Sequence, residues 1–411
     1  MTSTHSPPAA VPVLRVLGPF ACGYFLSYLY RTVNAVLAPE IGRSITLDAA
    51  DLGLMTGIYF IAFGAFQLPL GLLLDRFGPR RVEAALLLFA AGGALAFSLA
   101  DGVGALVVGR ALVGFGVSSC LMAPLKANVQ WFEKSRLPLM NGIILGAGGL
   151  GAVAATGPVQ AALAATDWRG VYAGLAVLTV AAAAALFLIV PDRPTGAGVP
   201  LRRQLAEVAA IFRSPLFARV APTSMASLGG FMAVQGLWAG PWMRDVAGLD
   251  ANGAAAGLTA MAAGMAVGYL SIGAIAERLA RRGIPVVAVA AAGMAVFTVS
   301  GAFMAAGWST APLLLAAIYG FAGSSSALNY VILTQDFDAG LAGRVNTSLN
   351  LVIFLAAFSL QWGLGAVLRL WPTVDNHWPA EAWQAALWLP VVLQVLTLAW
   401  FIPAATARQK R

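Results

Sequence analysis

The segment GLLLDRFGPRR at residues 71–81 lies between two long apolar runs, and a weaker copy, GAIAERLARRG, occupies residues 273–283. Both segments begin with glycine and carry an acid followed by arginine at matched positions. The matched pairs, each 202 residues apart, are Gly71 and Gly273, Asp75 and Glu277, and Arg76 and Arg278. Because this separation is close to half of the 411-residue chain, the repeat predicts a protein built from two similar halves.

The rest of the sequence is too apolar for a water-soluble protein. Only 10% of the residues are charged, whereas globular proteins average about 25%, and 60% are hydrophobic, with a mean hydropathy of +0.81. A soluble fold cannot bury this much apolar surface. These values exclude a soluble enzyme, a disordered chain and a nucleic-acid-binding protein, although the net charge is +8.

Twelve apolar runs are long enough to cross a bilayer, for which a helix needs about 20 residues. Helices are required because backbone groups in lipid must find hydrogen-bond partners within their own segment. We predict an all-α membrane protein with an N-terminal half at 1–191, a linker with an amphipathic helix at 192–215 and a C-terminal half at 216–411. The twelve runs are 13–38, 52–74, 82–100, 104–126, 139–163, 170–191, 216–241, 254–276, 285–306, 311–333, 345–370 and 382–404.

Lysine and arginine positions predict the orientation of these spans. If both termini are cytoplasmic, 18 of the 25 basic residues fall in inner loops and tails, as the positive-inside rule requires. Both termini are therefore predicted on the cytoplasmic side of a bacterial inner membrane. The outer loops hold only Arg43, Arg169, Arg244 and Arg369.

The segment at 71–81 resembles the first motif of the major facilitator superfamily, and its copy after the eighth span resembles the degenerate second occurrence in that family. Span 4 adds Arg110, Gly114 and Gly116, similar to the family's second motif, and GAGGLGAVAATGP at 146–158 is similar to its glycine-rich fifth helix. The resemblance implies two pseudo-symmetric six-helix halves that work by alternating access.

The first motif implies a gate at the inner side. Asp75 is expected to face the positive end of the helix dipole at the start of span 11, near Arg344, and Glu277 to face the start of span 5, near Pro138 and Asn141. A simpler interpretation is that these charges only anchor the loops. The residues that we assign to coupling or gating are Asp75, Arg76, Arg80, Arg81, Arg110, Lys126, Glu277 and Arg278.

Arg31 lies about two thirds of the way through the first span. Helical spacing places it on one face with Tyr24, Ser27 and Asn34. Ionisable residues inside a membrane are costly and mark functional sites, and every acid falls in a tail, a loop or a span end. An anionic substrate would supply the charge that Arg31 lacks. The alternative is that Arg31 pairs with helix carbonyls or hydroxyls and only shapes the cavity.

The segment YLYRTVNAVLAP at 28–39 resembles the first helix of the anion:cation symporter branch of the superfamily, in which an arginine at this place binds anionic substrates. The sequence lacks the paired arginines of spans 2 and 8 that characterise nitrate carriers. The arginine in the first span and the lack of these paired arginines together favour a small organic anion as the substrate.

The second half offers polar and aromatic residues that suit a flat neutral metabolite. Gln235 and Trp238 share a face in span 7 and are able to hydrogen-bond and stack. Such residues also serve helix packing or membrane anchoring. The predicted substrate-binding residues in this half are Gln235, Trp238, Asn329, Tyr330 and Asn350.

A Cu(I) importer is a further alternative, because thioethers and thiolates favour this ion and a copper-importing branch of the superfamily has similarly spaced methionines. Methionine is also ordinary filler between membrane helices. The residues concerned are Met261, Met265, Met232, Cys22 and Cys120.

The sequence contains no nucleotide-binding motif and no nucleophile with a base inside a span. We therefore predict a secondary active transporter, not an enzyme, which acts as a monomer in the bilayer on a small-molecule substrate and uses no cofactor. A coupling proton would have to travel on the substrate or on a span-end carboxylate such as Glu40.

Overall fold

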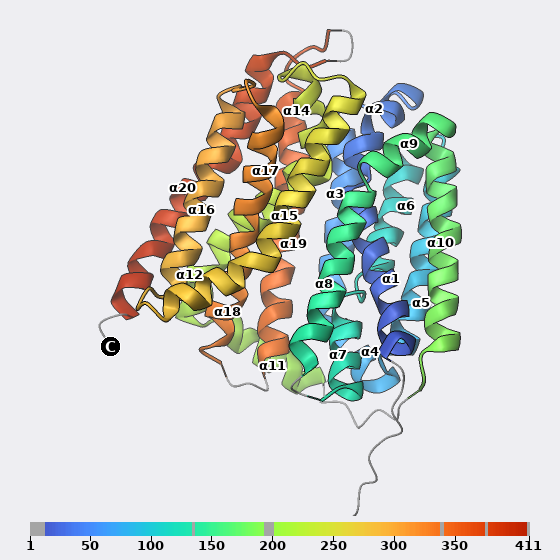
Figure 1. The fold of residues 1–411 in the computed structure, drawn as a ribbon. Coiled ribbons are helices and arrows are strands. Elements are labelled where there is room, and N and C mark those ends of the chain that lie inside the picture. Colours follow the sequence, from blue (N-terminus) through green and yellow to red (C-terminus); the bar gives the residue numbers. More distant parts are fainter. Residues whose placement is uncertain (1–12, 134–135, 193–200, 338–340, 375–376, 409–411) are drawn as a thin grey trace, which may run out of the picture.

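The computed structural model describes residues 13–133, 136–192, 201–337, 341–374 and 377–408, which form two bundles of helices side by side (Figure 1). The N-terminal bundle contains α1 (Val13–Thr32), α2 (Asn34–Ser44), α3 (Ala49–Ala65), α4 (Gln67–Phe77), α5 (Pro79–Ser98), α6 (Val103–Gly116), α7 (Met122–Trp131), α8 (Leu137–Ala154), α9 (Gly157–Ala165) and α10 (Trp168–Ile189). The next helix, α11 (Leu201–Phe212), lies in the range predicted for the linker. The C-terminal bundle contains α12 (Pro215–Ser224), α13 (Gly230–Ala233), α14 (Ala239–Asp245), α15 (Ala251–Ala280), α16 (Val286–Ala305), α17 (Pro312–Gly323), α18 (Leu328–Thr334), α19 (Ala342–Leu368) and α20 (Ala380–Arg408).

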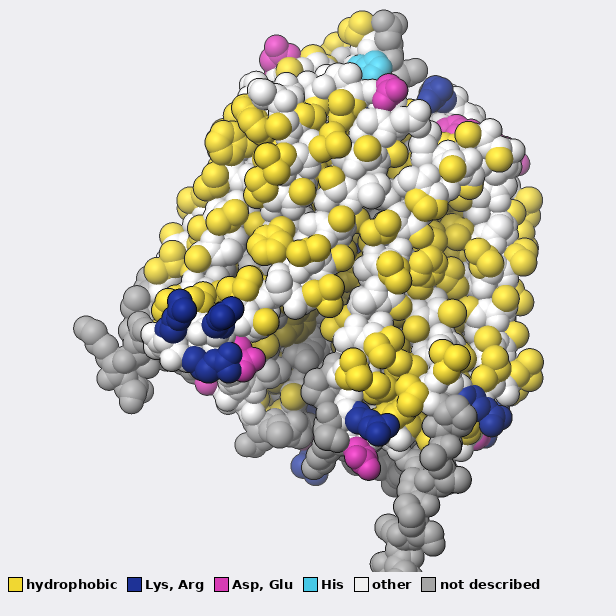
Figure 2. All heavy atoms as spheres, viewed as in Figure 1, with side chains coloured by type: hydrophobic (Ala, Val, Ile, Leu, Met, Phe, Trp, Pro, Cys, Tyr) yellow, Lys and Arg dark blue, Asp and Glu magenta, His cyan; other side chains and the backbone are white. Residues whose placement is uncertain are grey.

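These helices make up the twelve predicted spans. Seven single helices among the described residues are long and apolar enough to cross a membrane, and two bent pairs, α3 with α4 and α8 with α9, bring the number to nine. The remaining three spans are interrupted helices: α6 with α7, α12 to α14, and α17 with α18. The prediction of twelve helices in two halves is confirmed. Hydrophobic side chains cover the middle of the molecule, and most of the lysine and arginine side chains in view lie at its lower rim (Figure 2).

Each of the two sequence repeats contains a glycine with positive φ. Gly78 joins α4 to α5, and Gly283 lies between α15 and α16, and each has φ of 80°. Glycine reaches this left-handed region without the steric penalty of a Cβ atom. Both turns lie at the lower end of Figure 1, which the arginine distribution predicts to be cytoplasmic. We call this the inner end and the opposite one the outer end.

The two halves pack tightly toward the outer end. There α3 lies against α19 so closely that a Cβ atom on Gly53 would be 2.8 Å from the carbonyl oxygen of Gln361, and one on Gly365 would overlap the carbonyl oxygen of Ala49. Beside this pair, the hydroxyl groups of Thr156 and Thr259 are 2.8 Å apart and connect the start of α9 with α15. Small residues thus allow the helix backbones to approach, as in other membrane bundles.

The halves separate toward the inner end. In Figure 1, α15 runs near α8 at the top and away from it at the bottom, and Figure 2 shows the surface hollowed between the halves over their lower part. A cavity of about 250 Å³ opens here between α4 and α7 on one side and α19 on the other. Its polar lining residues are Gln67, Asp75, Lys126, Arg344 and Thr347. The structure is therefore closed at the outer end and open at the inner end.

We expect Gly365→Val to lower the free energy of unfolding by about 1–3 kcal/mol, because the added side chain overlaps Ala49 and overpacks the contact between the halves. The melting temperature of the purified protein would measure this. Gly363→Val is the matched control, since a Cβ atom there meets nothing within 4 Å. Equal changes in both variants would contradict the close packing.

Candidate functional site

Arg31 lies in the last turn of α1, at the point where the two halves meet. Its side chain is buried, with 6% of its surface exposed. The guanidinium carbon is 4.5 Å from the centre of the Tyr28 ring and 5.5 Å from each of the Phe63 and Phe354 rings. Phe63 belongs to α3 of the N-terminal half and Phe354 to α19 of the C-terminal half. The cation therefore sits in an aromatic setting that both halves supply.

No carboxylate balances this charge. Among the described residues, no acid lies within 4 Å of the Arg31 guanidinium, and no hydrogen bond runs from it to a helix carbonyl. Its Nε has no hydrogen-bond partner. The groups that interact with it electrostatically are the phenols of Tyr59, Tyr28 and Tyr24. These contacts show no helix carbonyl bound to Arg31, whereas the Tyr59 hydroxyl does interact with it, as the hydroxyl part of the alternative expects.

Three residues of the C-terminal half complete the surroundings. Tyr269 on α15 and Tyr330 on α18 both interact electrostatically with Tyr28 and Arg31, and the Tyr330 hydroxyl donates a hydrogen bond to Asn350 on α19. Both tyrosines are half-buried. The site of Arg31 thus combines a cation, phenol groups and aromatic faces.

Of the residues predicted to bind substrate, Arg31, Tyr24, Tyr330 and Asn350 lie near one another, together with neighbours that the prediction did not include. Only Tyr28 had a usable signal, since it precedes Arg31 by three residues and shares its helical face. The other missed residues come from three different helices, so no spacing in the sequence connects them: Tyr59, Phe63, Tyr269 and Phe354.

Asn34 does not share the site. Its amide nitrogen donates to the Thr56 hydroxyl at 3.1 Å, and its amide oxygen accepts from the Tyr172 hydroxyl at 2.6 Å. Tyr172 in turn accepts from Arg110 at 3.2 Å. These groups form a network inside the N-terminal half, so the expectation that Asn34 faces the substrate is corrected. The side chain of Asn34 is instead held by Thr56 of α3 and Tyr172 of α10.

Ser27 and Arg110 lie on either side of the same ring. The Tyr59 hydroxyl donates to the backbone oxygen of Ser27 at 3.3 Å, and the Arg110 guanidinium carbon is 5.1 Å from the Tyr59 ring centre. Arg110 is fully buried, and its Nε and one terminal nitrogen have no partner. Tyr59 therefore lies between two buried cations, Arg31 and Arg110.

The predicted residues of span 7 and span 10 are mostly committed to packing. Trp238 is fully buried, and its indole nitrogen donates to the backbone oxygen of Gln361 at 2.9 Å. Asn329 is also fully buried and donates to the Ser224 hydroxyl at 2.9 Å. Gln235 keeps an amide nitrogen without a partner. The expectation that Trp238 stacks on a flat solute is therefore corrected, because its ring is enclosed by protein.

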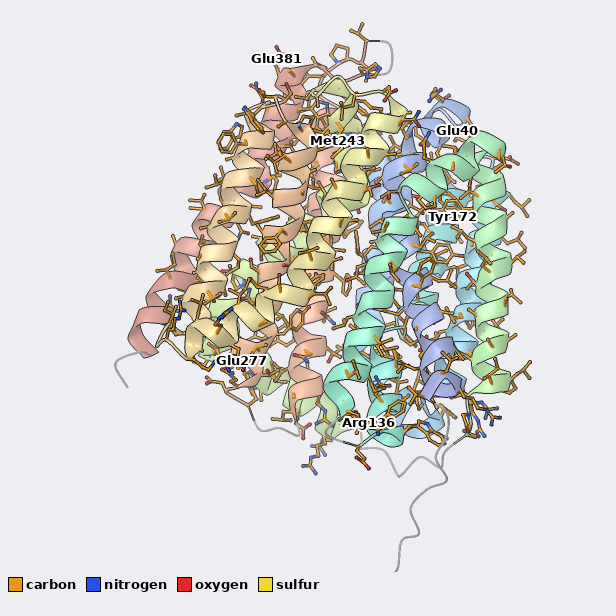
Figure 3. The ribbon with its side chains drawn as sticks, in the orientation of Figure 1. Glu40, Arg136, Tyr172, Met243, Glu277 and Glu381 are labelled. Carbon is orange, nitrogen blue, oxygen red and sulfur yellow. The ribbon has the colours of Figure 1, made fainter. Side chains whose placement is uncertain are left out.

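The gating acids have partners other than those expected. Asp75 forms an ion pair with Lys126, inside the same half, and shares the lining of the inner cavity with Gly343 and Arg344 at the start of α19. Arg344, at that start, pairs instead with Glu207 of α11 at 2.5 Å. In the C-terminal half, Glu277 is exposed and pairs with Arg281 one turn later, at 3.2 Å. Glu277 also lies on the opposite half from Arg136, which precedes α8 (Figure 3).

The motif arginines likewise make contacts within one half. Arg81 pairs with Asp192 after α10, and the Arg80 guanidinium carbon is 4.9 Å from the Phe187 ring centre in α10. Arg76 lies 5.2 Å from the ring of its neighbour Phe77, and Arg278 lies in the last turn of α15. Arg80 and Arg81 thus attach the start of α5 to the end of α10.

The sulfur-bearing residues are dispersed. Cys22 is exposed on α1, whereas Cys120 is buried between α6 and α7, beside Glu83. Met261 and Met265 are buried on α15, and Met232 lies in α13. This arrangement gives the Cu(I) alternative no support.

Glu83 lies near a span end, as expected, but it is buried. It lies in the second turn of α5, is fully buried, and neither carboxyl oxygen has a hydrogen bond of normal geometry. Its neighbours are the Cys120 thiol and the backbone of α1 at Gly23, where an added Cβ atom would overlap the carboxyl group. A buried carboxylate without partners is costly, so we expect this group to hold a proton. In the sequence, Glu83 looks like the other acids near the inner ends of the spans, so its burial could not be predicted.

Comparison with known proteins identifies relatives that share this architecture. A family model described as Major Facilitator Superfamily matches residues 20–360. The chain is 30% identical over 191 residues to the nitrate/nitrite transporter NrtP of Nostoc punctiforme, covering 44% of this chain and 38% of that protein. It is 27% identical over 165 residues to the probable sulfoacetate transporter SauU of Cupriavidus necator, covering 40% of this chain and 38% of that protein. The chain thus spans under two fifths of the length of these relatives.

Solved structures show the fold over nearly the whole chain. A bacterial homolog of the human lysosomal transporter Spinster, in an inward-facing and unoccupied conformation, superimposes with a TM-score of 0.75. The match covers 98% of this chain and 99% of that one, at 18% sequence identity. Similarity at this level concerns the fold alone.

Proposed function

The chain belongs to the major facilitator superfamily, and we propose that it is a secondary transporter that moves a small organic anion across the bacterial inner membrane by alternating access. The observation that carries this proposal is Arg31, a buried cation between the halves without a carboxylate partner among the described residues. Burying an unpaired charge costs several kcal/mol, and such a charge is retained for a function.

The setting of Arg31 favours an organic anion in particular. A carboxylate or sulfonate accepts two hydrogen bonds from the guanidinium fork, and the phenols of Tyr28 and Tyr269 add further hydrogen-bonding groups nearby. The rings of Phe63 and Phe354 suit an apolar carbon skeleton. The names of the relatives NrtP and SauU, which refer to an inorganic and an organic anion, agree with this class of substrate.

The charges at the inner end support alternating access. With the halves apart at this end, Asp75 binds Lys126 and Arg344 binds Glu207. We propose that closure brings Asp75 to the start of α19 in place of Lys126, because the positive end of that helix dipole attracts the carboxylate. The exchange of partners keeps Asp75 compensated in both conformations.

The first test is transport of labelled two- to four-carbon carboxylates and sulfonates, and of nitrate, into proteoliposomes. We expect Arg31→Gln to weaken substrate binding by roughly 30-fold or more, equivalent to 2 kcal/mol, the lower end of the cost of truncating a buried charged partner. The substrate affinity of Arg31→Lys should lie between those of the wild type and Arg31→Gln, because lysine keeps the positive charge but lacks the paired N–H donors of the guanidinium group. Arg15→Gln, an exposed change on the same helix, is the matched control.

The substrate itself provides a control that does not depend on folding. An amide analogue of the transported acid has nearly the same shape without the negative charge, so it should neither compete nor be transported. Competition by the amide at the affinity of the acid, or uptake by Arg31→Gln at the wild-type rate, would refute the anion proposal. Transport of nitrate alone would make the substrate inorganic.

We further propose Glu83, in place of Glu40, as the carboxyl group that carries a coupling proton. Glu40 lines a cavity at the outer end with Arg43 and Arg244, whereas Glu83 is enclosed next to Cys120. We expect Glu83→Gln to retain exchange of labelled for unlabelled anion but to lose accumulation driven by an inward proton gradient. Glu40→Gln serves as the comparison, and undiminished accumulation by Glu83→Gln would exclude the role.

A further inference from the structure

Arginine is scarce in the predicted outer loops, yet three of the four outer arginines converge on one cavity. Arg43, Arg244 and Arg369 line a space of about 720 Å³ at the outer end. Arg43 lies in the last turn of α2, Arg244 lies in α14 and Arg369 follows α19, so both halves contribute. The positive-inside rule disfavours these positions. Their convergence therefore calls for a reason other than topology.

Two of these cations face one another. Arg43 and Arg244 interact electrostatically across the boundary between the halves, and both also line a smaller neighbouring cavity that contains Glu40. The Nε of Arg43 donates to the backbone oxygen of Pro39 at 3.2 Å. Among the described residues, no acid lies within 4 Å of either guanidinium. Like charges held together in this way attract an anion from solution.

The nearby acids are engaged elsewhere. Asp48, the one carboxylate among the residues lining the cavity, is 3.5 Å from Arg369 in an exposed pair. Asp245 is buried and receives three donors: His377 at 2.6 Å, the Trp378 backbone at 3.1 Å and the Trp383 indole at 3.0 Å. Asp245 thus fixes the segment that forms one wall, and its carboxylate also attracts the neighbouring Arg244, with no acid of the described residues within 4 Å of that guanidinium.

Packed aromatic residues form the base of this cavity and separate it from Arg31. Trp378 lines the cavity, and its ring centre is 6.2 Å from that of the fully buried Trp238. Close contact of α3 with α19 at Gly365 closes the route beside them. In Figure 3, Glu40 marks the outer end of the N-terminal half and Met243 the adjoining part of the C-terminal half.

We propose that Arg43, Arg244 and Arg369 form an outer docking site that collects a small carboxylate or sulfonate before the outer end opens and passes it to Arg31. This inference rests on the proposed function and adds a second binding site and an inward direction. A cleft lined by one sign of charge raises the local concentration of an oppositely charged solute and its association rate. Opening of the halves would separate Arg43 from Arg244 and release the anion toward the centre.

The test compares uptake from the outer side with uptake from the inner side, in right-side-out and inverted membrane vesicles. We expect Arg43→Gln combined with Arg244→Gln to raise the KM for outer-side uptake about 10-fold at low ionic strength and to leave the maximal rate unchanged. In 0.5 M salt, the outer-side KM of the double variant should differ from that of the wild type by less than about twofold, because screening removes long-range attraction. Uptake from the inner side should keep its wild-type KM.

Two further variants separate an electrostatic role from a structural one. Arg43→Lys with Arg244→Lys keeps the charges and should restore the outer-side KM. Arg169→Gln, which removes the fourth outer arginine, should have no effect, since Arg169 binds the Ala100 backbone and Asp101 away from this cavity.

The outcomes distinguish this inference from the proposed function. An unchanged outer-side KM in the double glutamine variant, or equal changes on both sides, would overturn the docking site while anion transport stands. If no anion is transported by the wild-type protein in either vesicle type, the proposed function itself fails.

Discussion

The burial of a guanidinium without an acid determines how the centre of this protein is organised. Arg31 is surrounded by aromatic rings and phenol groups from α1, α3, α15, α18 and α19. These groups lower the free-energy cost of burying the cation but do not remove it. A carboxylate at this point would neutralise the cation and leave nothing for a substrate to supply. Two acids of the N-terminal half are engaged elsewhere: Asp75 is paired with Lys126, and Glu83 is enclosed beside Cys120.

The division of polar contacts between the halves fits a protein that rocks about its middle. Most ion pairs near the inner end lie within one half, such as Arg81 with Asp192 and Glu277 with Arg281. At the outer end, Arg369 pairs with Asp48 across the boundary, and Thr156 meets Thr259. The contacts that cross the boundary are weak individually, so the outer end is able to separate without leaving buried charges unpaired.

Several site residues were predictable because their signal is local. Arg31 was identified from its position in an apolar run, and Tyr24 from its helical spacing with Arg31. Asn34 fits the same spacing but points elsewhere, because Thr56 and Tyr172, which are distant in the sequence, bind its amide group. Trp238 shows the same limitation, since its acceptor, the backbone of Gln361, is more than a hundred residues away.

Sequence alone determined the twelve spans, the two related halves and the isolated cation in span 1, because hydrophobic length and charge cost depend on neighbouring residues in the chain. Only the tertiary structure decided which helices surround that cation, that Glu83 is enclosed, and that Arg43, Arg244 and Arg369 share one cavity. These features depend on how helices from opposite halves pack, and packing joins residues whose separation in the chain carries no periodic signal. The end at which the halves open was likewise set by tertiary contacts, through the close approach of α3 and α19 at Gly365.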